Sequence, residues 1–218
     1  KNNFEFGSVF SIAEKVKGGN LFYYIIESDF ISVDIAKVIL LQVAYALRFI
    51  HKSGYIYYDL KPENIVLHTK FIRSVKDVDV RLIDFDFMTD KEEAESKGPT
   101  AGTQLYMAPE VLRKYYSNGE INEFHKPHTD KLDIFSFGIN IIVLLLKTDE
   151  DAFSFKDNTM VFKDESVFIK PEYLDKLLTS KFNELFKLAK HCLKLEPTAR
   201  PDINTVVEKL ERMKSETP

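Results

Sequence analysis

One short stretch, residues 55–67, constrains this chain more than any other. It reads Tyr-Ile-Tyr-Tyr-Asp-Leu-Lys-Pro-Glu-Asn-Ile-Val-Leu, so apolar residues lie on both sides of a polar centre. This pattern predicts a polar loop between two short strands. The centre carries an acid at Asp59, a cation at Lys61 and an amide at Asn64. Such a loop can hold three different polar groups over one small volume.

These three groups are the ones that phosphoryl transfer from a nucleotide requires. An acid orients the attacking hydroxyl and accepts its proton, while a cation neutralises charge on the moving phosphoryl group. An amide oxygen can bind a Mg²⁺ ion that bridges the phosphates. A further carboxylate, Asp84, follows the apolar pair Leu82-Ile83. Carboxylates are preferred ligands of Mg²⁺, so Asp84 is a second candidate metal ligand.

Two more motifs follow in order, Gly102-Thr-Gln-Leu-Tyr-Met-Ala-Pro-Glu110 and Asp133-Ile-Phe-Ser-Phe-Gly138. With residues 55–67 and Asp84-Phe-Asp86, they form a set that resembles the signature of eukaryotic protein kinases. The sequence Lys61-Pro-Glu63 is similar to that of the serine/threonine type. The set as a whole resembles the calcium/calmodulin-dependent-like branch of that type. The resemblance implies a mainly α fold with short β-hairpins, which is the C-terminal lobe of a kinase that is α+β when complete.

The resemblance begins at the hinge of a kinase and continues over nearly the whole chain. It implies that residues 1–16 are the last strands of the small lobe with the hinge, and that residues 17–218 are the C-terminal lobe. The glycine-rich loop, strand lysine and helix glutamate of the small lobe have no counterpart, because too few residues precede residue 14. The chain is then either part of a longer kinase or a lobe-only protein that binds partners.

The resemblance also implies a role for each candidate site residue. Asp59 would orient the substrate hydroxyl, Lys61 would contact the transferred phosphoryl group, and Thr103 would form a hydrogen bond near both. Asn64 and Asp84 would bind Mg²⁺. The nucleotide, ATP, would be held by a gatekeeper position, by main-chain groups of the hinge and by residues around the ribose and adenine; these are Ala13, Glu14, Val16, Asn20, Val66 and Ile83.

Two departures from the kinase pattern support a second hypothesis, a pseudokinase-like scaffold without activity. Tyr58 replaces an arginine that grips a phosphate on the activation loop, which removes this form of control. Asp86 replaces a glycine and restricts the backbone there. A third hypothesis, a kinase-fold enzyme acting on a small molecule, is disfavoured by residues 102–110, which resemble the part that seats a peptide.

The remaining motifs predict structural roles. Glu110 and Arg200 are expected to form a buried ion pair, and Asp133 is expected to bond to the backbone of the catalytic loop. His51, at the end of a predicted helix, is expected to cap that helix or to be solvated. His125 and His128 are three apart, but no cysteine or acid pattern completes a zinc site around them.

Helical periodicity predicts helices over residues 33–50, 133–147, 182–195 and 203–213. Residues 87–101 are polar and predict a mobile activation loop, and residues 148–172 predict irregular structure.

Composition narrows the classes of partner and compartment. The net charge of −4 gives no general affinity for nucleic acid or for an anionic membrane. The longest apolar run, Ile139 to Leu146, is too short to cross a bilayer. A single cysteine, Cys192, excludes an internal disulfide, and residues 1–5 do not have the pattern of a signal peptide. We therefore expect a cytoplasmic protein. The resemblance implies that its partners are protein substrates, and it leaves room for a regulatory partner.

Overall fold

The computed structural model describes residues 14–97, 103–116, 130–148, 169–178 and 182–213, with short pieces between residues 153 and 167. The described residues form a helical body around one central helix, α5 (Asp130–Leu146). Every residue of α5 from Leu132 to Leu145 is buried. A helix that is apolar on all sides belongs in the interior of a protein, so α5 forms the centre of the core.

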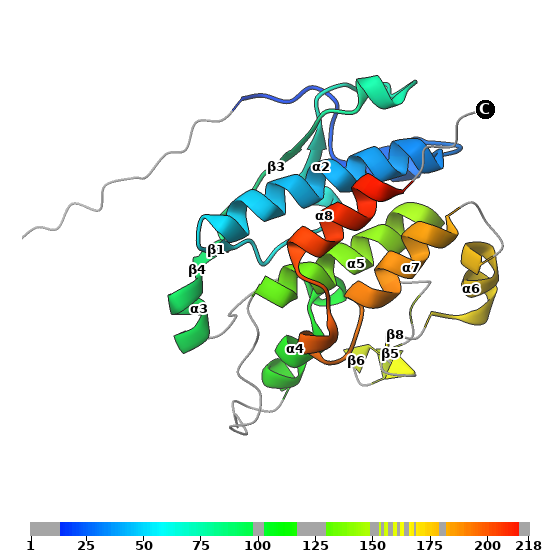
Figure 1. The fold of residues 1–218 in the computed structure, drawn as a ribbon. Helices are drawn as coiled ribbons and strands as arrows, with labels where there is room; N and C mark the ends of the chain where they lie inside the picture. Colours follow the sequence, from blue (N-terminus) through cyan, green and yellow to red (C-terminus); the bar gives the residue numbers. More distant parts are fainter. Residues whose placement is uncertain are drawn as a thin grey trace, which may run out of the picture.

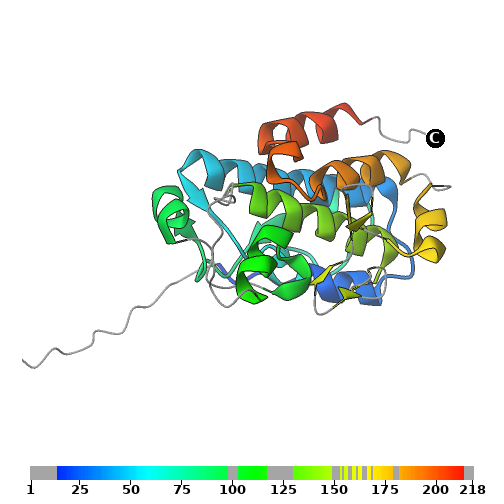
Figure 2. The ribbon, with the colours of Figure 1, turned by 90° about the horizontal axis from the view of Figure 1, so that it is seen from below.

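Two helices pack against α5, namely α2 (Val33–Lys52) and α7 (Asn183–Cys192), and α8 (Ile203–Arg212) packs against both of them. Figure 1 shows α8 lying along α2, with α5 and α7 side by side beneath them. The contact between α5 and α7 is close because Gly138 has no side chain. A Cβ atom at this position would lie 2.8 Å from Cγ of Leu193 and 2.9 Å from Cβ of Cys192. Figure 2 shows α8 on one outer side of this group.

The first long helix, α2, is specified by signals in its own sequence. Ser32 is its N-cap, and its hydroxyl accepts a hydrogen bond from the backbone N–H of Ile35 at 3.2 Å. One face is buried and consists of Ile35, Ala36, Ile39, Leu40, Val43, Ala44, Leu47, Ile50 and His51. The helix ends at Lys52, just before Gly54, which has a positive φ of 86°. The chain then enters the stretch that contains the candidate catalytic residues.

Short antiparallel strand pairs flank this stretch. Strand β1 (Tyr55–Ile56) pairs with β4 (Thr89–Asp90), and β2 (Ile65–Leu67) pairs with β3 (Val80–Leu82). Between residues 153 and 169, β5 (Phe155–Lys156) pairs with β6 (Thr159–Met160), and β7 (Phe162–Lys163) pairs with β8 (Ser166–Val167). The prediction of irregular structure over residues 148–172 therefore missed two hairpins.

The remaining elements of the described structure are shorter helices and turns. They are α1 (Leu21–Glu27), α3 (Lys91–Lys97), α4 (Pro109–Tyr116) and α6 (Pro171–Leu178), with 3₁₀ turns η1 (Pro62–Asn64), η2 (Val75–Asp77), η3 (Gln104–Tyr106) and η5 (Pro197–Ala199). The fold class is thus confirmed as mainly α with short β-hairpins. In the described part of the chain, no helix is long and apolar enough to span a membrane.

One predicted loop is instead ordered over much of its length. Residues 87–101 were expected to be mobile, but β4 and α3 lie within them. The strand pairing continues into the helix, because the backbone N–H of Lys91 donates to the carbonyl of Gly54 at 2.9 Å. Ala94 is only 1% exposed. Glutamate, alanine and lysine favour helices, so a segment that looks like a solvated loop from its charge forms a helix once one face is buried.

Candidate active site

One buried carboxylate holds the backbone of the candidate catalytic loop in place. Asp133 of α5 is fully buried and accepts hydrogen bonds from the backbone N–H groups of Tyr57, at 2.9 Å, and Tyr58, at 2.8 Å. Nε2 of His51 lies 2.8 Å from the same carboxylate. A buried carboxylate is stable only when its oxygens have partners, and here the loop itself supplies two of them. The expected bond between Asp133 and the loop backbone is therefore confirmed.

A second polar residue of α5 holds the other side of the loop. Asn140 donates from Nδ2 to the carbonyl of Leu60 at 3.0 Å and to the carbonyl of Ser136 at 2.8 Å. Ser136 in turn donates from Oγ to the carbonyl of Tyr106 at 2.7 Å. Helix α5 thus anchors both the catalytic loop and the segment that follows Thr103.

Asp59 is only 3% exposed, and three other predicted site residues contact its carboxylate. Nζ of Lys61 lies 2.8 Å from Oδ2 of Asp59 and donates to Oγ1 of Thr103 at 2.9 Å. The hydroxyl of Thr103 donates to Oδ1 of Asp59 at 3.2 Å. Asn64 donates from Nδ2 to both the carbonyl and Oδ2 of Asp59, each at 2.9 Å. Acid, cation, hydroxyl and amide therefore form one connected cluster.

Asp84 lies beside this cluster but has a different environment. The β2–β3 pairing brings it there, because the backbone N–H of Ile83 donates to the carbonyl of Asn64 at 3.0 Å. Asp84 is exposed and has a positive φ of 61°, which is uncommon outside glycine and asparagine. The backbone N–H of Asp86 points to Oδ1 of Asp84 at 3.4 Å. The metal-ligand role predicted for Asp84 and Asn64 stays a prediction.

Tyr57 connects the catalytic loop to the backbone next to Asp84. Its hydroxyl donates to the carbonyl of Ile83, and its ring meets that of Phe85 edge to face with centroids 5.7 Å apart. Burial, with the nearby charges of Asp59, Asp84 and Asp133, raises the pKa of Tyr57 far above its usual value. Its hydroxyl therefore stays protonated and serves as a hydrogen-bond donor.

Tyr58 occupies the position where the kinase pattern has arginine. Its backbone has a positive φ of 68°, and such a conformation costs about 1–2 kcal/mol for a residue with a side chain. The bond to Asp133 holds it there. Burial, and secondarily the charge of Asp133, raises the pKa of Tyr58 to about 12. Its hydroxyl is buried and has no hydrogen-bond partner within the part of the chain that the structure describes.

The glycine pair that follows the predicted hinge runs beside β2. The backbone N–H of Gly18 donates to the carbonyl of Leu67 at 2.9 Å, and the N–H of Leu67 donates to the carbonyl of Gly19 at 2.8 Å. A Cβ at position 18 would lie 2.3 Å from the carbonyl oxygens of both Leu67 and Thr69, so this approach requires glycine. Gly18 and Gly19 therefore lie directly alongside the strand that leaves the candidate catalytic loop, and the assignment of residues 1–16 to the hinge and small lobe stays a prediction.

The residues predicted to bind the nucleotide contact one another less than the residues around Asp59 do. Asn20 forms an isolated β-bridge with Val66, which is 8% exposed, and Ile83 is 38% exposed. The side-chain oxygen of Asn20 accepts from the N–H of Tyr23 at 3.0 Å and so caps α1. Glu14 is exposed, with Oε1 4.0 Å from Nδ1 of His68, and Val16 is partly buried. Ala13 lies outside the described residues.

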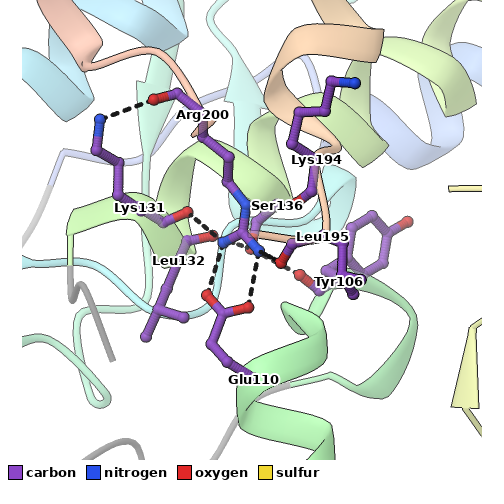
Figure 3. Close-up of polar contacts among 8 residues, drawn as sticks. All are labelled: Tyr106, Glu110, Lys131, Leu132, Ser136, Lys194, Leu195 and Arg200. Carbon is purple, nitrogen blue, oxygen red and sulfur yellow. Dashed lines mark hydrogen bonds and ion pairs between the residues drawn. The ribbon is translucent and has the colours of Figure 1, made fainter. Parts of the chain in front are cut away.

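A buried ion pair fixes the segment that follows Thr103. Figure 3 shows Arg200 with both terminal nitrogens on the carboxylate of Glu110, at 2.6 and 2.7 Å. The remaining N–H groups of Arg200 donate to the carbonyls of Lys194 at 2.8 Å, Leu195 at 3.1 Å and Lys131 at 3.1 Å. The predicted Glu110–Arg200 pair is confirmed, and it ties α4 to the turn before α8.

Two supporting residues were not identified correctly from the sequence. His51 was expected to be a cap or solvated, but it is buried beside Asp133, because α5 passes under the end of α2. Asn140 was noticed only as a polar residue in an apolar run, and that interruption was the available signal for its role. Over the described residues, no group of three or more His, Cys, Asp or Glu side chains could hold a metal ion. His125 and His128 lie outside the described residues.

Comparisons with known proteins agree with this arrangement. The protein kinase domain family matches residues 5–210. The ovarian-specific serine/threonine-protein kinase Lok of Drosophila melanogaster is 27% identical over 203 residues, covering 92% of this chain and 39% of that protein. Calcium-dependent protein kinase 4 of Plasmodium berghei is 34% identical over 135 residues, covering 62% of this chain and 22% of that protein. The chain thus spans well under half the length of these relatives.

A solved structure shows the same fold. The crystal structure of Rad53 kinase domain and SCD2 superposes with a TM-score of 0.66 at 20% identity, covering 93% of this chain and 66% of that one. The fold is that of a protein kinase domain. This chain belongs to the protein kinase family.

Proposed function

We propose that this chain transfers the γ-phosphoryl group of ATP to serine or threonine hydroxyls of protein substrates. The observation that carries the proposal is the connected cluster of Asp59, Lys61, Thr103 and Asn64. Its relatives are serine/threonine-protein kinases by name. Residues 1–16 would belong to the hinge and small lobe, and residues 17–218 would be the C-terminal lobe.

In this proposal each member of the cluster has its own task. The carboxylate of Asp59 would orient the substrate hydroxyl and take its proton as the oxygen attacks the phosphorus in line. Lys61 and Thr103 would hold the carboxylate in place, since both contact it and each other. The ammonium of Lys61 would also neutralise charge on the transferred group, where a fixed cation in a partly buried site is most effective.

The residues present fit a Mg²⁺ site of the kind that uses few protein ligands. Mg²⁺ in such sites takes one or two protein oxygens and completes its shell with phosphate oxygens and water. The amide nitrogen of Asn64 is committed to Asp59, so its amide oxygen is the atom that would serve as a ligand. Asp84 would supply a carboxylate from the adjacent strand end. Bound Mg²⁺ would neutralise the charge of the phosphates.

A second candidate function is a pseudokinase-like scaffold that binds partners without catalysis. Two observations favour it. Oδ1 of Asp84 faces the N–H of Asp86, which stands where a glycine is usual. Tyr58 replaces the arginine that would bind an activation-loop phosphate, so an ordered activation loop would need other contacts to hold it in place. The β1–β4 pairing and α3 supply such contacts, which is compatible with either function.

Single substitutions in the cluster test the proposal. The assay measures phosphate transfer from radiolabelled ATP to a mixed serine/threonine peptide array, with a matched tyrosine array and small alcohols as alternative acceptors. We expect Asp59→Asn to lower the rate by about 10²–10⁴-fold, the usual effect of losing a general base. Thr103→Ala should lower the rate, whereas Thr103→Ser keeps the hydroxyl and should restore it. Asp79→Asn, in an exposed ion pair with Arg81, is the control.

Nucleotide binding is measured separately by thermal shift with ATP, with and without Mg²⁺, beside Asp84→Asn. Stabilisation that requires Mg²⁺ and is lost in Asp84→Asn would support the metal role. Binding without transfer to any acceptor would favour the scaffold. Transfer to an alcohol but to no peptide would contradict the protein-kinase proposal.

A further inference from the structure

A groove of about 630 Å³ lies far from the Asp59 cluster, where three helices meet. It lies between the first turns of α2, the exposed side of α7 and the last turn of α8. Figure 1 shows these three segments next to one another at the side of the molecule opposite α3. Its apolar lining consists of Leu185 and Leu188, which are 1% and 2% exposed, and of Val33 and Met213, which are partly exposed.

The charged groups around this groove are nearly all basic. One acid, Glu184, faces four lysine and arginine residues, with one histidine beside them: Lys37, Lys187, Lys209, Arg212 and His191. This bias contrasts with the chain as a whole, which carries 34 Asp and Glu residues against 30 Lys and Arg residues. A local excess of one charge on an oppositely charged protein attracts a complementary partner and orients its approach.

Acidic side chains of the protein itself cancel little of this charge. Glu184 pairs with Lys187 at 2.7 Å, but both side chains are more than half exposed. Arg212 pairs with Glu208 at 3.3 Å, and its side chain is 80% exposed. Such exposed pairs contribute well under about 1 kcal/mol, so either cation is free to exchange its partner for an incoming carboxylate.

A contact between two helices fixes the shape of the groove. Val33 and Lys37 belong to the first turns of α2. The ammonium of Lys37 donates to the carbonyl of Met213, which links the start of α2 to the end of α8. The groove is therefore held in shape by a contact between residues far apart in the sequence.

We propose that this groove binds an acidic segment of a protein partner that also carries apolar side chains. Carboxylates of the segment would meet the lysine and arginine side chains, and its apolar side chains would cover the exposed parts of Val33 and Met213 above Leu185 and Leu188. The apolar lining favours a peptide over a nucleic acid strand, because a phosphate backbone offers nothing to bury there. This surface thus suits a docking segment that brings a substrate or regulator to the kinase domain.

The groove is remote enough to be tested independently of catalysis. From Lys37 to Lys52, the end of α2 that leads to the catalytic loop, the helix rises about 22 Å at 1.5 Å per residue. Substitutions at the groove should therefore leave phosphate transfer to a short peptide unchanged. Failure of the docking proposal would not affect the proposed function, and the converse also holds.

The test is fluorescence anisotropy with a labelled peptide Glu-Glu-Leu-Glu-Phe-Glu-Glu. We expect the double variant Lys187→Glu with Arg212→Glu to bind the peptide at least about ten-fold more weakly. Both side chains are exposed, so the variant should fold normally. The charge-matched control is Lys52→Glu with Lys176→Glu, which changes exposed lysines elsewhere and should bind within about two-fold of the original.

Three results would overturn the proposal. These are no binding to the unaltered chain, equal loss in the control variant, or equal affinity for a peptide with glutamine in place of glutamate. Binding of phosphatidylserine vesicles that depends on Lys187 and Arg212, without binding of the peptide, would also overturn it, since the partner would then be a lipid surface. Weaker peptide binding when the leucine and phenylalanine are replaced by serine would support the role of the apolar lining.

Discussion

The Glu110–Arg200 pair gives a prediction whose size follows from the structure. The guanidinium is 0% exposed and the carboxylate 6%. All five N–H donors of arginine are used, two by Glu110 and three by the carbonyls of Lys131, Lys194 and Leu195. Arg200 also stacks over the ring of Phe135, with its central carbon 5.0 Å from the centroid.

Glu110→Ala should therefore destabilise the domain strongly. It leaves a buried cation without its counter-charge and two donors without acceptors, because water cannot reach them. Breaking a buried pair in this way costs about 3–5 kcal/mol. Since the free energy of unfolding of a whole domain is about 5–15 kcal/mol, the variant should lose a large part of its stability.

Urea denaturation followed by circular dichroism measures this loss. The control is Arg212→Ala, which breaks an ion pair of similar chemistry with Glu208, but on the surface, and should cost less than about 0.5 kcal/mol. Replacing both Glu110 and Arg200 should cost less than the sum of the single changes, since no lone charge remains. A loss below about 1 kcal/mol for Glu110→Ala would refute the argument from burial.

Three further predictions concern single positions. Tyr58→Phe should leave the free energy of unfolding unchanged or raise it by up to about 1 kcal/mol, because it removes a buried hydroxyl without a described partner. The pKa of Tyr58 is about 12 in the folded protein and 10 ordinarily, so its contribution to the free energy of unfolding is complete below pH 10 and falls from pH 10 to 12. This alkaline loss should shrink in the variant. A substantial loss of stability at neutral pH in Tyr58→Phe would contradict this. Gly18→Ala should cost about 1–3 kcal/mol in urea denaturation and weaken ATP binding, since its Cβ meets two carbonyl oxygens next to the predicted hinge. An unchanged midpoint would show that the backbone at Gly18 shifts freely. Asp202→Ala removes the N-cap of α8, whose carboxylate accepts from the N–H of Thr205 at 2.7 Å, and should lower the free energy of unfolding by about 1 kcal/mol at neutral pH. This bond lowers the pKa of Asp202 below 3.8, so the loss of stability should persist above pH 4 and disappear as the pH falls further. Asp202→Asn should show no such dependence on pH.

The sequence by itself determined the features that depend on neighbouring residues. The helix α2 follows from Ser32 and from apolar residues at helical spacing, and α5 follows from its apolar run. The contact among the proposed catalytic residues Asp59, Lys61 and Asn64 was predictable because they lie in one loop, where spacing along the chain decides which groups meet. The Glu110–Arg200 pair spans 90 residues and was predictable only through the resemblance to a family.

The tertiary structure decided the features that depend on how helices pack. The partnership of His51 with Asp133 requires α5 to pass under the end of α2, and no local pattern encodes that crossing. The helix α3 forms because one face of a charged segment becomes buried. Asn20 caps α1 because the chain turns there. The basic groove joins residues from positions 33 to 213, whose charges look scattered in the sequence. Local patterns specify elements, whereas only the packing of those elements brings distant side chains into one site.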